Sequence, residues 1–177
     1  MALTSDIWVP DSSALIKIKR IVPGASQWDA FRKLEGLVDG GAIAIPRQVI
    51  NEMGRIAHPD APGVWAQGMR GRLIHPQDPD YKHVEAVMAG AGEVVDPNKT
   101  EEDADPYVLA LARQLGSDKL ATVVTDERVD RLPIKICMTT ACNRLHIPVC
   151  TTEDFLSALS IPFKAPTPDE DDDTDED

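Results

Sequence analysis

Short apolar runs that alternate with helix-like stretches are the feature that most restricts how this chain can fold. The runs cover residues 6–9, 42–45, 93–95, 120–125 and 148–150. Apolar spacing, caps and breakers predict helices at 12–19, 26–38, 46–56, 64–71, 81–88, 105–115, 138–145 and 152–159. Strands that alternate with helices build α/β domains with a parallel sheet. We therefore expect an α/β fold with a mostly parallel central sheet.

Acidic residues stand where several of these segments begin or end. Asp11 follows the first run, Glu52 lies in the helix after the second, Asp105 opens the helix at 105–115, and Asp126 and Glu127 end the run at 120–125. Ligands bind such sheets outside the carboxyl ends of the strands, so these acids should meet at one edge. Carboxylates that share a pocket repel one another unless a cation balances them. Mg²⁺ and Mn²⁺ suit such oxygen ligands and support phosphodiester hydrolysis.

Each of these acids also has an ordinary structural explanation. Asp11 and Asp105 are good helix caps, Glu52 fits a solvated helix face, and acids are common in the turn that holds Asp126 and Glu127. The metal-site hypothesis therefore depends on the joint occurrence of the four positions in this order.

Composition restricts the class of protein. The chain has 177 residues, which suits a single domain, and we predict a domain at 1–162 and a disordered acidic tail at 163–177. The net charge is −12, but residues 165–177 carry eight acids and no base. No apolar run is long enough to span a membrane and no signal peptide is recognisable, so we expect a cytoplasmic protein without a membrane partner. Three cysteines and four histidines show no zinc-ligand spacing, and the cysteines are expected in the core.

The order of motifs resembles the PIN-domain family, whose best-known members are the VapC-type toxins of bacterial toxin–antitoxin pairs. The matching motifs are Asp11-Ser12-Ser13, Val49-Ile50-Asn51-Glu52, Asp105-Pro106-Tyr107-Val108-Leu109-Ala110 and Val123-Val124-Thr125-Asp126-Glu127. Trp28, Cys142, Ile147 and Phe155-Leu156 fit one branch of the family. The resemblance covers roughly residues 6–160.

This resemblance implies a three-layer α/β/α PIN-like fold with a twisted sheet and a metal-dependent endoribonuclease that uses Mg²⁺ or Mn²⁺. Asp11, Glu52 and Asp105 match the metal-binding positions. The fourth acid is Glu127 by the usual spacing, with the adjacent Asp126 as the other candidate. Ser13 and Thr125 match hydroxyls that hold the pocket by hydrogen bonds, whereas Glu102 and Asp103 are expected to have loop roles. The implied partners are an RNA substrate, an antitoxin protein and a second copy of the chain in a homodimer.

Other interpretations remain open at this stage. A non-catalytic PIN-like module that binds RNA or a protein would have the same fold. A haloacid-dehalogenase-like phosphatase needs a second Asp two residues after the first, where this chain has Ser13. Trp28, Phe31 and Trp65 are candidates for stacking on RNA bases, although their helical spacing favours the core.

Overall fold

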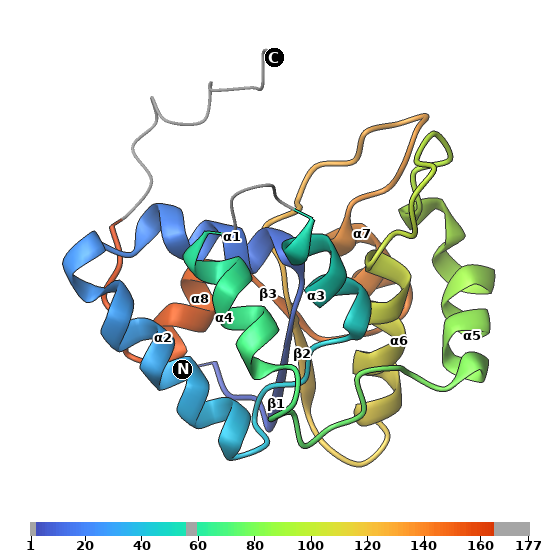
Figure 1. Cartoon of the computed structure of the whole chain (residues 1–177). Helices are drawn as coiled ribbons and strands as arrows, with labels where there is room; N and C mark the ends of the chain where they lie inside the picture. Colours follow the sequence, from blue (N-terminus) through green and yellow to red (C-terminus); the bar gives the residue numbers. More distant parts are fainter. Residues whose placement is uncertain (1–2, 56–59, 165–177) are drawn as a thin grey trace.

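Three parallel strands form the centre of the molecule. The computed structural model describes residues 3–55 and 60–164, whose path is drawn in Figure 1. The strands β1 (Ile7–Pro10), β2 (Ala121–Val124) and β3 (Val149–Cys150) form one sheet in the order β1-β2-β3. Every residue of β1 and β2 is buried, as expected for a parallel sheet covered on both faces. The predicted α/β class with a parallel sheet is confirmed.

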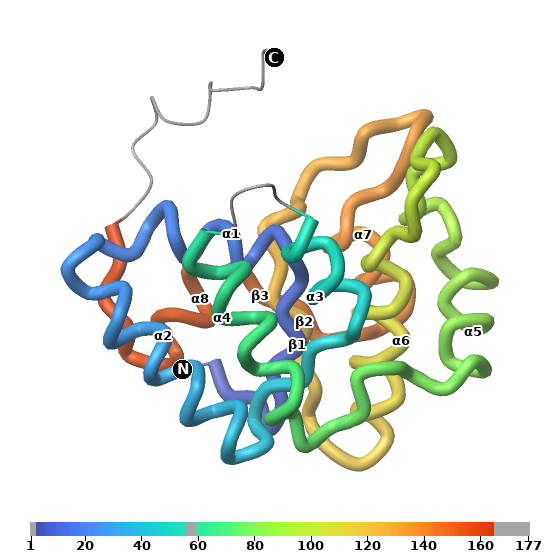
Figure 2. The backbone as a smooth tube through the Cα atoms, in the orientation of Figure 1, coloured from blue at the N-terminus to red at the C-terminus, as the bar shows by residue number. Residues whose placement is uncertain are grey.

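Helices surround this sheet on both sides. They are α1 (Ser12–Ile21), α2 (Gly24–Asp39), α3 (Arg47–Gly54), α4 (Ala61–Met69), α5 (Tyr81–Ala91), α6 (Asp105–Leu115), α7 (Met138–Arg144) and α8 (Thr152–Ala158), with the 3₁₀ turn η1 (Gly92–Val94) after α5. Figure 1 shows α2, α4 and α8 to one side of the strands and α5, α6 and α7 to the other. The backbone trace in Figure 2 shows the same three-layer α/β/α arrangement. None of the helices within the described residues is long and apolar enough to cross a membrane.

Helix α6 is the central element of its layer. It packs against β1 and β2 on one side and against α5 on the other. Its residues 108–112 are therefore at most 1% exposed. Pro106 fits the first turn, where a backbone N–H would have no helical partner, and the helix ends before Gly116. This helix matches its predicted bounds.

The register of the strands aligns three chain segments at one edge of the sheet. Pro10 pairs with Val124, and Val124 pairs with Cys150. The backbone N–H of Asp11 donates to Val124 O at 3.0 Å, and that of Thr125 donates to Cys150 O at 3.1 Å. The chain therefore leaves β1 and β2 side by side at their carboxyl ends.

Two predicted strands are wrong. Residues 42–45 form only a single parallel bridge, between Ile43 and Trp8, because Gly41 turns immediately before them and Pro46 caps α3 immediately after. Residues 93–95 belong mostly to η1, which continues directly from α5 and buries Val94. Ile56, predicted on the third helix, and residues 165–177 of the predicted acidic tail lie outside the described residues.

The prediction that Trp28 belongs to the core is also wrong, because its side chain is 73% exposed. The buried side of α2 is centred on Leu34 and Val38. At about 100° per residue, Trp28 lies roughly 60° around the helix from Phe31 and roughly 120° from Leu34, so it faces solvent. Phe31 is buried, and its ring centroid lies 5.9 Å from that of Trp65. The three cysteines are free and buried, as predicted.

Phe155 offers a direct test of this packing. It is 1% exposed, and its ring packs edge-on against Trp8 of β1 with 5.1 Å between centroids. Phe155→Ala should lower the free energy of unfolding by about 3–5 kcal/mol, because it leaves a cavity between α8 and the sheet. Urea unfolding followed by circular dichroism measures the change. Trp28→Ala is the control, and it should change stability by less than about 1 kcal/mol; similar losses in both variants would contradict the assigned core.

Candidate functional site

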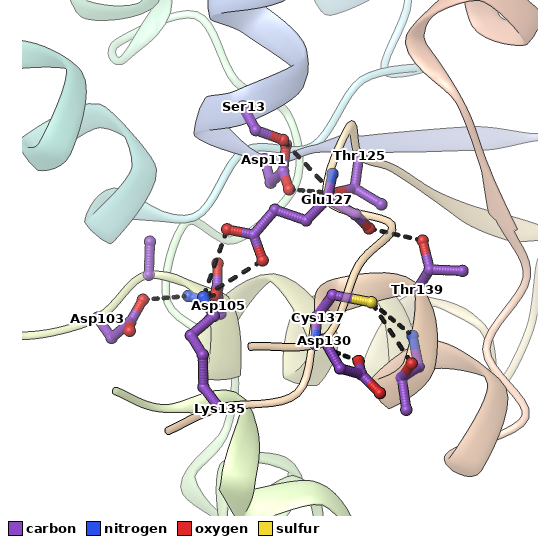
Figure 3. Close-up of polar contacts among 12 residues, drawn as sticks. Asp11, Ser13, Asp103, Asp105, Thr125, Glu127, Asp130, Lys135, Cys137 and Thr139 are labelled. Atoms are coloured by element: carbon purple, nitrogen blue, oxygen red, sulfur yellow. Dashed lines mark hydrogen bonds and ion pairs between the residues drawn. The ribbon is translucent and has the colours of Figure 1, made fainter. Parts of the chain in front are cut away.

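Asp11 is held at the carboxyl edge of the sheet by hydrogen bonds to both carboxylate oxygens. Its Oδ1 accepts from the backbone N–H of Ala14 at 2.8 Å, which caps α1, and from the Ser13 hydroxyl at 2.7 Å. Its Oδ2 accepts from the Thr125 hydroxyl at the end of β2. Ser13 and Thr125, predicted to support the pocket, thus both contact Asp11 (Figure 3). The N-cap and the predicted site acid are the same residue.

The two acids after β2 point to different neighbours. The Glu127 carboxylate lies between Asp11 and Asp105 (Figure 3), and its backbone N–H donates to the Thr125 hydroxyl at 3.1 Å. Asp126 instead forms an ion pair with Lys17 of α1 at 2.7 Å. Of the two candidates for the fourth acid, the structure therefore brings Glu127 to Asp11 and Asp105, and it turns Asp126 toward α1.

Asp105 is the second buried acid of this edge, and it contacts a lysine. Its Oδ2 accepts from Lys135 Nζ at 2.9 Å. The same Nζ lies 3.3 Å and 3.2 Å from the two carboxylate oxygens of Glu127. Asp11, Asp105 and Glu127 are called the three-acid site below, and Lys135 is the cation within it.

Glu52 holds neighbouring elements together rather than joining this ion pair. Its Oε2 accepts from the Ser12 hydroxyl at 2.6 Å and its Oε1 from the Ala104 backbone N–H at 3.1 Å. These bonds link α3 to the start of α1 and to the residue before α6. Glu52 also lines a pocket of about 520 Å³ with Arg55, Lys99 and neighbouring residues of the 98–102 loop.

The two adjacent acids in the loop before α6, Glu102 and Asp103, differ in exposure. Asp103 is 5% exposed, and its Oδ2 lies 3.5 Å from Lys99 Nζ. Glu102 is exposed and accepts a hydrogen bond from the Tyr107 hydroxyl. Asp103 is therefore a buried neighbour of Asp105, whereas Glu102 lies on the surface.

Burial and like charge make these carboxyl groups hard to ionise. Burial, with a smaller contribution from Glu127, raises the pKa of Asp11 to about 6 despite its hydrogen bonds. Burial and the Glu127 charge raise the pKa of Asp105 to about 7, although Lys135 opposes the shift. Burial lowers the pKa of Lys135, but the charges of Asp105 and Glu127 outweigh it and the pKa lies above its usual value. A cation thus stabilises the ionised acids of the site.

Lys135 was missed by sequence reasoning. It is 3% exposed, and it sits between Ile134 and Ile136 in the apolar stretch after Pro133. A single lysine inside an apolar stretch is a weak signal of a buried ion pair, because lysines are almost never fully buried unless they are paired. The sequence does not show that its partners are Asp105 and Glu127.

The donors of the three-acid site have the chemistry that Mg²⁺ and Mn²⁺ prefer, since all are carboxylate oxygens. Glu127 Oε2 is buried and makes no hydrogen bond, but the Lys135 ammonium lies 3.2 Å from it. Within residues 3–55 and 60–164, no three Asp, Glu, His or Cys side chains are grouped so that they could hold a metal ion. The residues are of a kind that binds divalent ions, while the single charge of Lys135 is shared between Asp105 and Glu127.

Comparisons with known proteins support the fold. No curated protein matches the chain. A solved structure, described as the crystal structure of PAE2754 from Pyrobaculum aerophilum, is similar with a TM-score of 0.50 and 16% sequence identity, covering 88% of this chain and 90% of the other. At this identity the similarity concerns the fold alone. A family model described as "Domain of unknown function (DUF4411)" matches residues 8–163. Because that match spans most of its length, the chain belongs to the DUF4411 family.

Proposed function

We propose that the chain is a metal-dependent endoribonuclease that hydrolyses RNA phosphodiester bonds, and that it is the toxin of a toxin–antitoxin pair. The observation that carries the proposal is the convergence of Asp11, Asp105 and Glu127, from three separate segments, on one edge of the parallel sheet. Their motifs resemble those of PIN-domain ribonucleases. The expected partners are an RNA substrate, an antitoxin protein and a second copy of the chain.

Each residue of the site has a role in this proposal. Mg²⁺ or Mn²⁺, when bound, would activate water and neutralise the charge that grows on the phosphate. Asp11, Asp105 and Glu127 would hold the ion through their carboxylate oxygens. Ser13 and Thr125 fix the orientation of Asp11, and their hydrogen bonds favour its ionised form. Glu52, whose two oxygens are already bonded, positions the helix starts around the pocket.

One observation favours a second candidate function. The Lys135 ammonium already forms ion pairs with Asp105 and Glu127, and such an arrangement would also suit a non-catalytic module that binds RNA or a protein. The two candidates differ in a single measurement, because only the nuclease cleaves RNA.

RNA cleavage tests the proposal directly. Purified full-length protein should cut single-stranded RNA in the presence of Mn²⁺, and Asp105→Asn should slow the cut by at least about 100-fold, since roughly 3 kcal/mol of charge stabilisation is lost. Gel analysis of end-labelled RNA measures the rate. Asp118→Asn is the matched control, because Asp118 is exposed in the loop after α6. RNA binding without cleavage by the wild-type protein would favour the non-catalytic module.

The role of Asp11 is tested by metal binding in the absence of RNA. Asp11→Asn should weaken Mn²⁺ binding by about tenfold or more, since one charged ligand is lost while the cap hydrogen bond from Ala14 can be kept. Isothermal titration calorimetry measures the affinity. Equal affinity in the two proteins would show that the metal site is misassigned.

Growth tests the toxin role. Induced expression of the wild-type chain should arrest bacterial growth and cleave cellular RNA, whereas Asp105→Asn should do neither because the cleavage step is lost. Asp118→Asn should behave as the wild type does. Cell counts and RNA gels from the same cultures are compared. Normal growth with the wild-type chain, at protein levels matched by immunoblot, would contradict the toxin role. The nuclease activity itself would still be tested by RNA cleavage with the purified protein.

A further inference from the structure

A cavity lies at the edge of the sheet opposite the three-acid site. It has a volume of about 520 Å³ and lies between α5, the end of α6, the start of β2 and the segment after α7. Its wall includes Ala121, which pairs with Ile7 where the first two strands begin. In Figure 1 the loop after α6 lies at the bottom of the view, away from the end at which β1 passes into α1. This cavity is called the amino-edge pocket below.

Helix α6 connects the two edges of the sheet. It begins at Asp105 in the three-acid site, and Gly116 at its other end lines the amino-edge pocket. A rise of 1.5 Å per residue places these two residues roughly 16 Å apart along the helix. The pocket is therefore a separate place on the molecule, and none of its lining residues belongs to the three-acid site.

Every charged residue described along the wall of the pocket is a base. Arg113 of α6 and Lys119 of the following loop carry positive charges, and His83 and His146 can each gain one. This is unexpected in a chain that has 30 acids and 18 bases. Within residues 3–55 and 60–164, neither Arg113 nor Lys119 forms an ion pair. Their charges are therefore available to an anion.

The acids of this region line a neighbouring cavity instead. That cavity shares His83 and Lys119 with the amino-edge pocket, and it also contains Lys82, Asp80 and Asp118. Its two lysines are thus matched by two acids. The positive charge that is not balanced by a lining acid is found on the side of the amino-edge pocket.

The two histidines of the pocket both lie in strained or unfavourable surroundings. Burial lowers the pKa of His83, and the charges of Lys82 and Arg113 lower it further. A bound anion would relieve this repulsion. His146 follows α7 with a φ of 55°, a left-handed conformation that glycine or asparagine usually adopts after a helix. Strained residues of this kind cluster at ligand sites.

A purely structural role would also place bases here, because α6 and α7 both end at this edge and a helix C-terminus favours positive charge. The last turns are already closed by the main chain, however. Gly116 N–H donates to Ala112 O at 2.8 Å, and Ile147 N–H donates to Cys142 O at 2.9 Å. Lys119 lies outside both helices. Balancing the helix ends therefore does not account for the whole set of bases.

The pocket has an apolar floor beneath these bases. Ala112, Ala121 and Ile147 line it and are 1%, 2% and 7% exposed, whereas Arg113 and Lys119 are exposed at the rim. A guanidinium donates to two oxygens of a phosphate at once, and an ammonium adds a compact charge. Small-molecule sites typically combine such an apolar wall with a few polar groups. The pocket thus suits a molecule that is apolar at one end and anionic at the other.

We propose that the amino-edge pocket binds a small organic phosphate, a molecule that carries a phosphate group on an apolar body. Arg113 and Lys119 bind the phosphate, and the floor of Ala112, Ala121 and Ile147 contacts the apolar body. This binding site is additional to the proposed nuclease and does not depend on it.

Phenyl phosphate tests the inference, because it joins one phosphate to one aromatic ring. Isothermal titration calorimetry on the full chain, without RNA or divalent metal, measures its affinity. Arg113→Gln should weaken binding by about tenfold or more, since a charge-assisted contact is lost, and Lys119→Gln should weaken it in the same direction. Inorganic phosphate should bind about tenfold more weakly than phenyl phosphate, because it has no apolar surface to remove from water.

Arg32→Gln is the matched control. Arg32 is an exposed base of α2, which lies on the other side of the sheet in Figure 1, and the substitution removes the same charge. Its affinity for phenyl phosphate should equal that of the wild type. Circular dichroism confirms that the variants fold, which is expected because all three substituted side chains are exposed.

The histidine rings provide a second readout by proton nuclear magnetic resonance. Phenyl phosphate should shift the ring resonances of His83 and His146 in the wild type but not in the double variant Arg113→Gln/Lys119→Gln. The ring of His75 contacts Gly41 O and does not line the pocket, so its resonances should move less.

Three results would overturn the inference. The first is the absence of saturable binding of phenyl phosphate to the wild type. The second is equal affinity in the wild type and the double variant, which would place the phosphate elsewhere. The third is equal affinity for phenyl phosphate and inorganic phosphate, which would show that no apolar body is recognised. A lower melting temperature of the double variant without any binding by the wild type would show that the bases only stabilise the helix ends.

Discussion

The parallel pairing of β1 with β2 determines where the acids of the candidate site lie. These strands lie far apart in the sequence, yet the register that pairs Pro10 with Val124 places Asp11 beside Thr125. A shift of one residue would turn each strand side chain to the opposite face and separate these two residues. Because both strands are fully buried, such a shift would also expose apolar side chains. The burial that stabilises the sheet thus also specifies the position of the acids.

Asp11 shows that a structural role and a functional role are not alternatives. Its carboxylate caps α1, accepts from a hydroxyl on that helix and accepts from another on β2. These bonds fix the side chain before any ligand arrives. Burial nevertheless raises its pKa, so the fold keeps this acid in a place where a nearby positive charge would stabilise its ionised form. Residues of this kind are typical of ligand sites.

The sequence predicted the local parts of this structure well and the long-range parts less well. The bounds of helix α6 were predicted to the residue, because the Asp-Pro start, the apolar pattern and the terminal glycine are all local signals. Asp105, expected as its cap, is instead its first residue, and the N-cap is Ala104 without a side-chain hydrogen bond. The choice between Asp126 and Glu127 was not decided by sequence, since it depends on Lys17, which lies on α1 and attracts Asp126. Lys135 was missed because its burial depends on acids in other segments. The prediction of a strand at 42–45 was wrong because a run of apolar residues does not show how many backbone hydrogen bonds it will form with an adjacent strand. Here only Ile43 bridges to Trp8 of β1.

The buried cysteines have a consequence for how the protein can be observed. Burial raises the pKa of the Cys142 thiol well above its usual range, and it raises that of Cys150 to about 12. The thiolate, which is the form that reacts with alkylating reagents, is therefore scarce in the folded chain. Labelling at these two positions would report transient opening of the layers around β3 and α7, so the native sequence already carries its own probes of core dynamics.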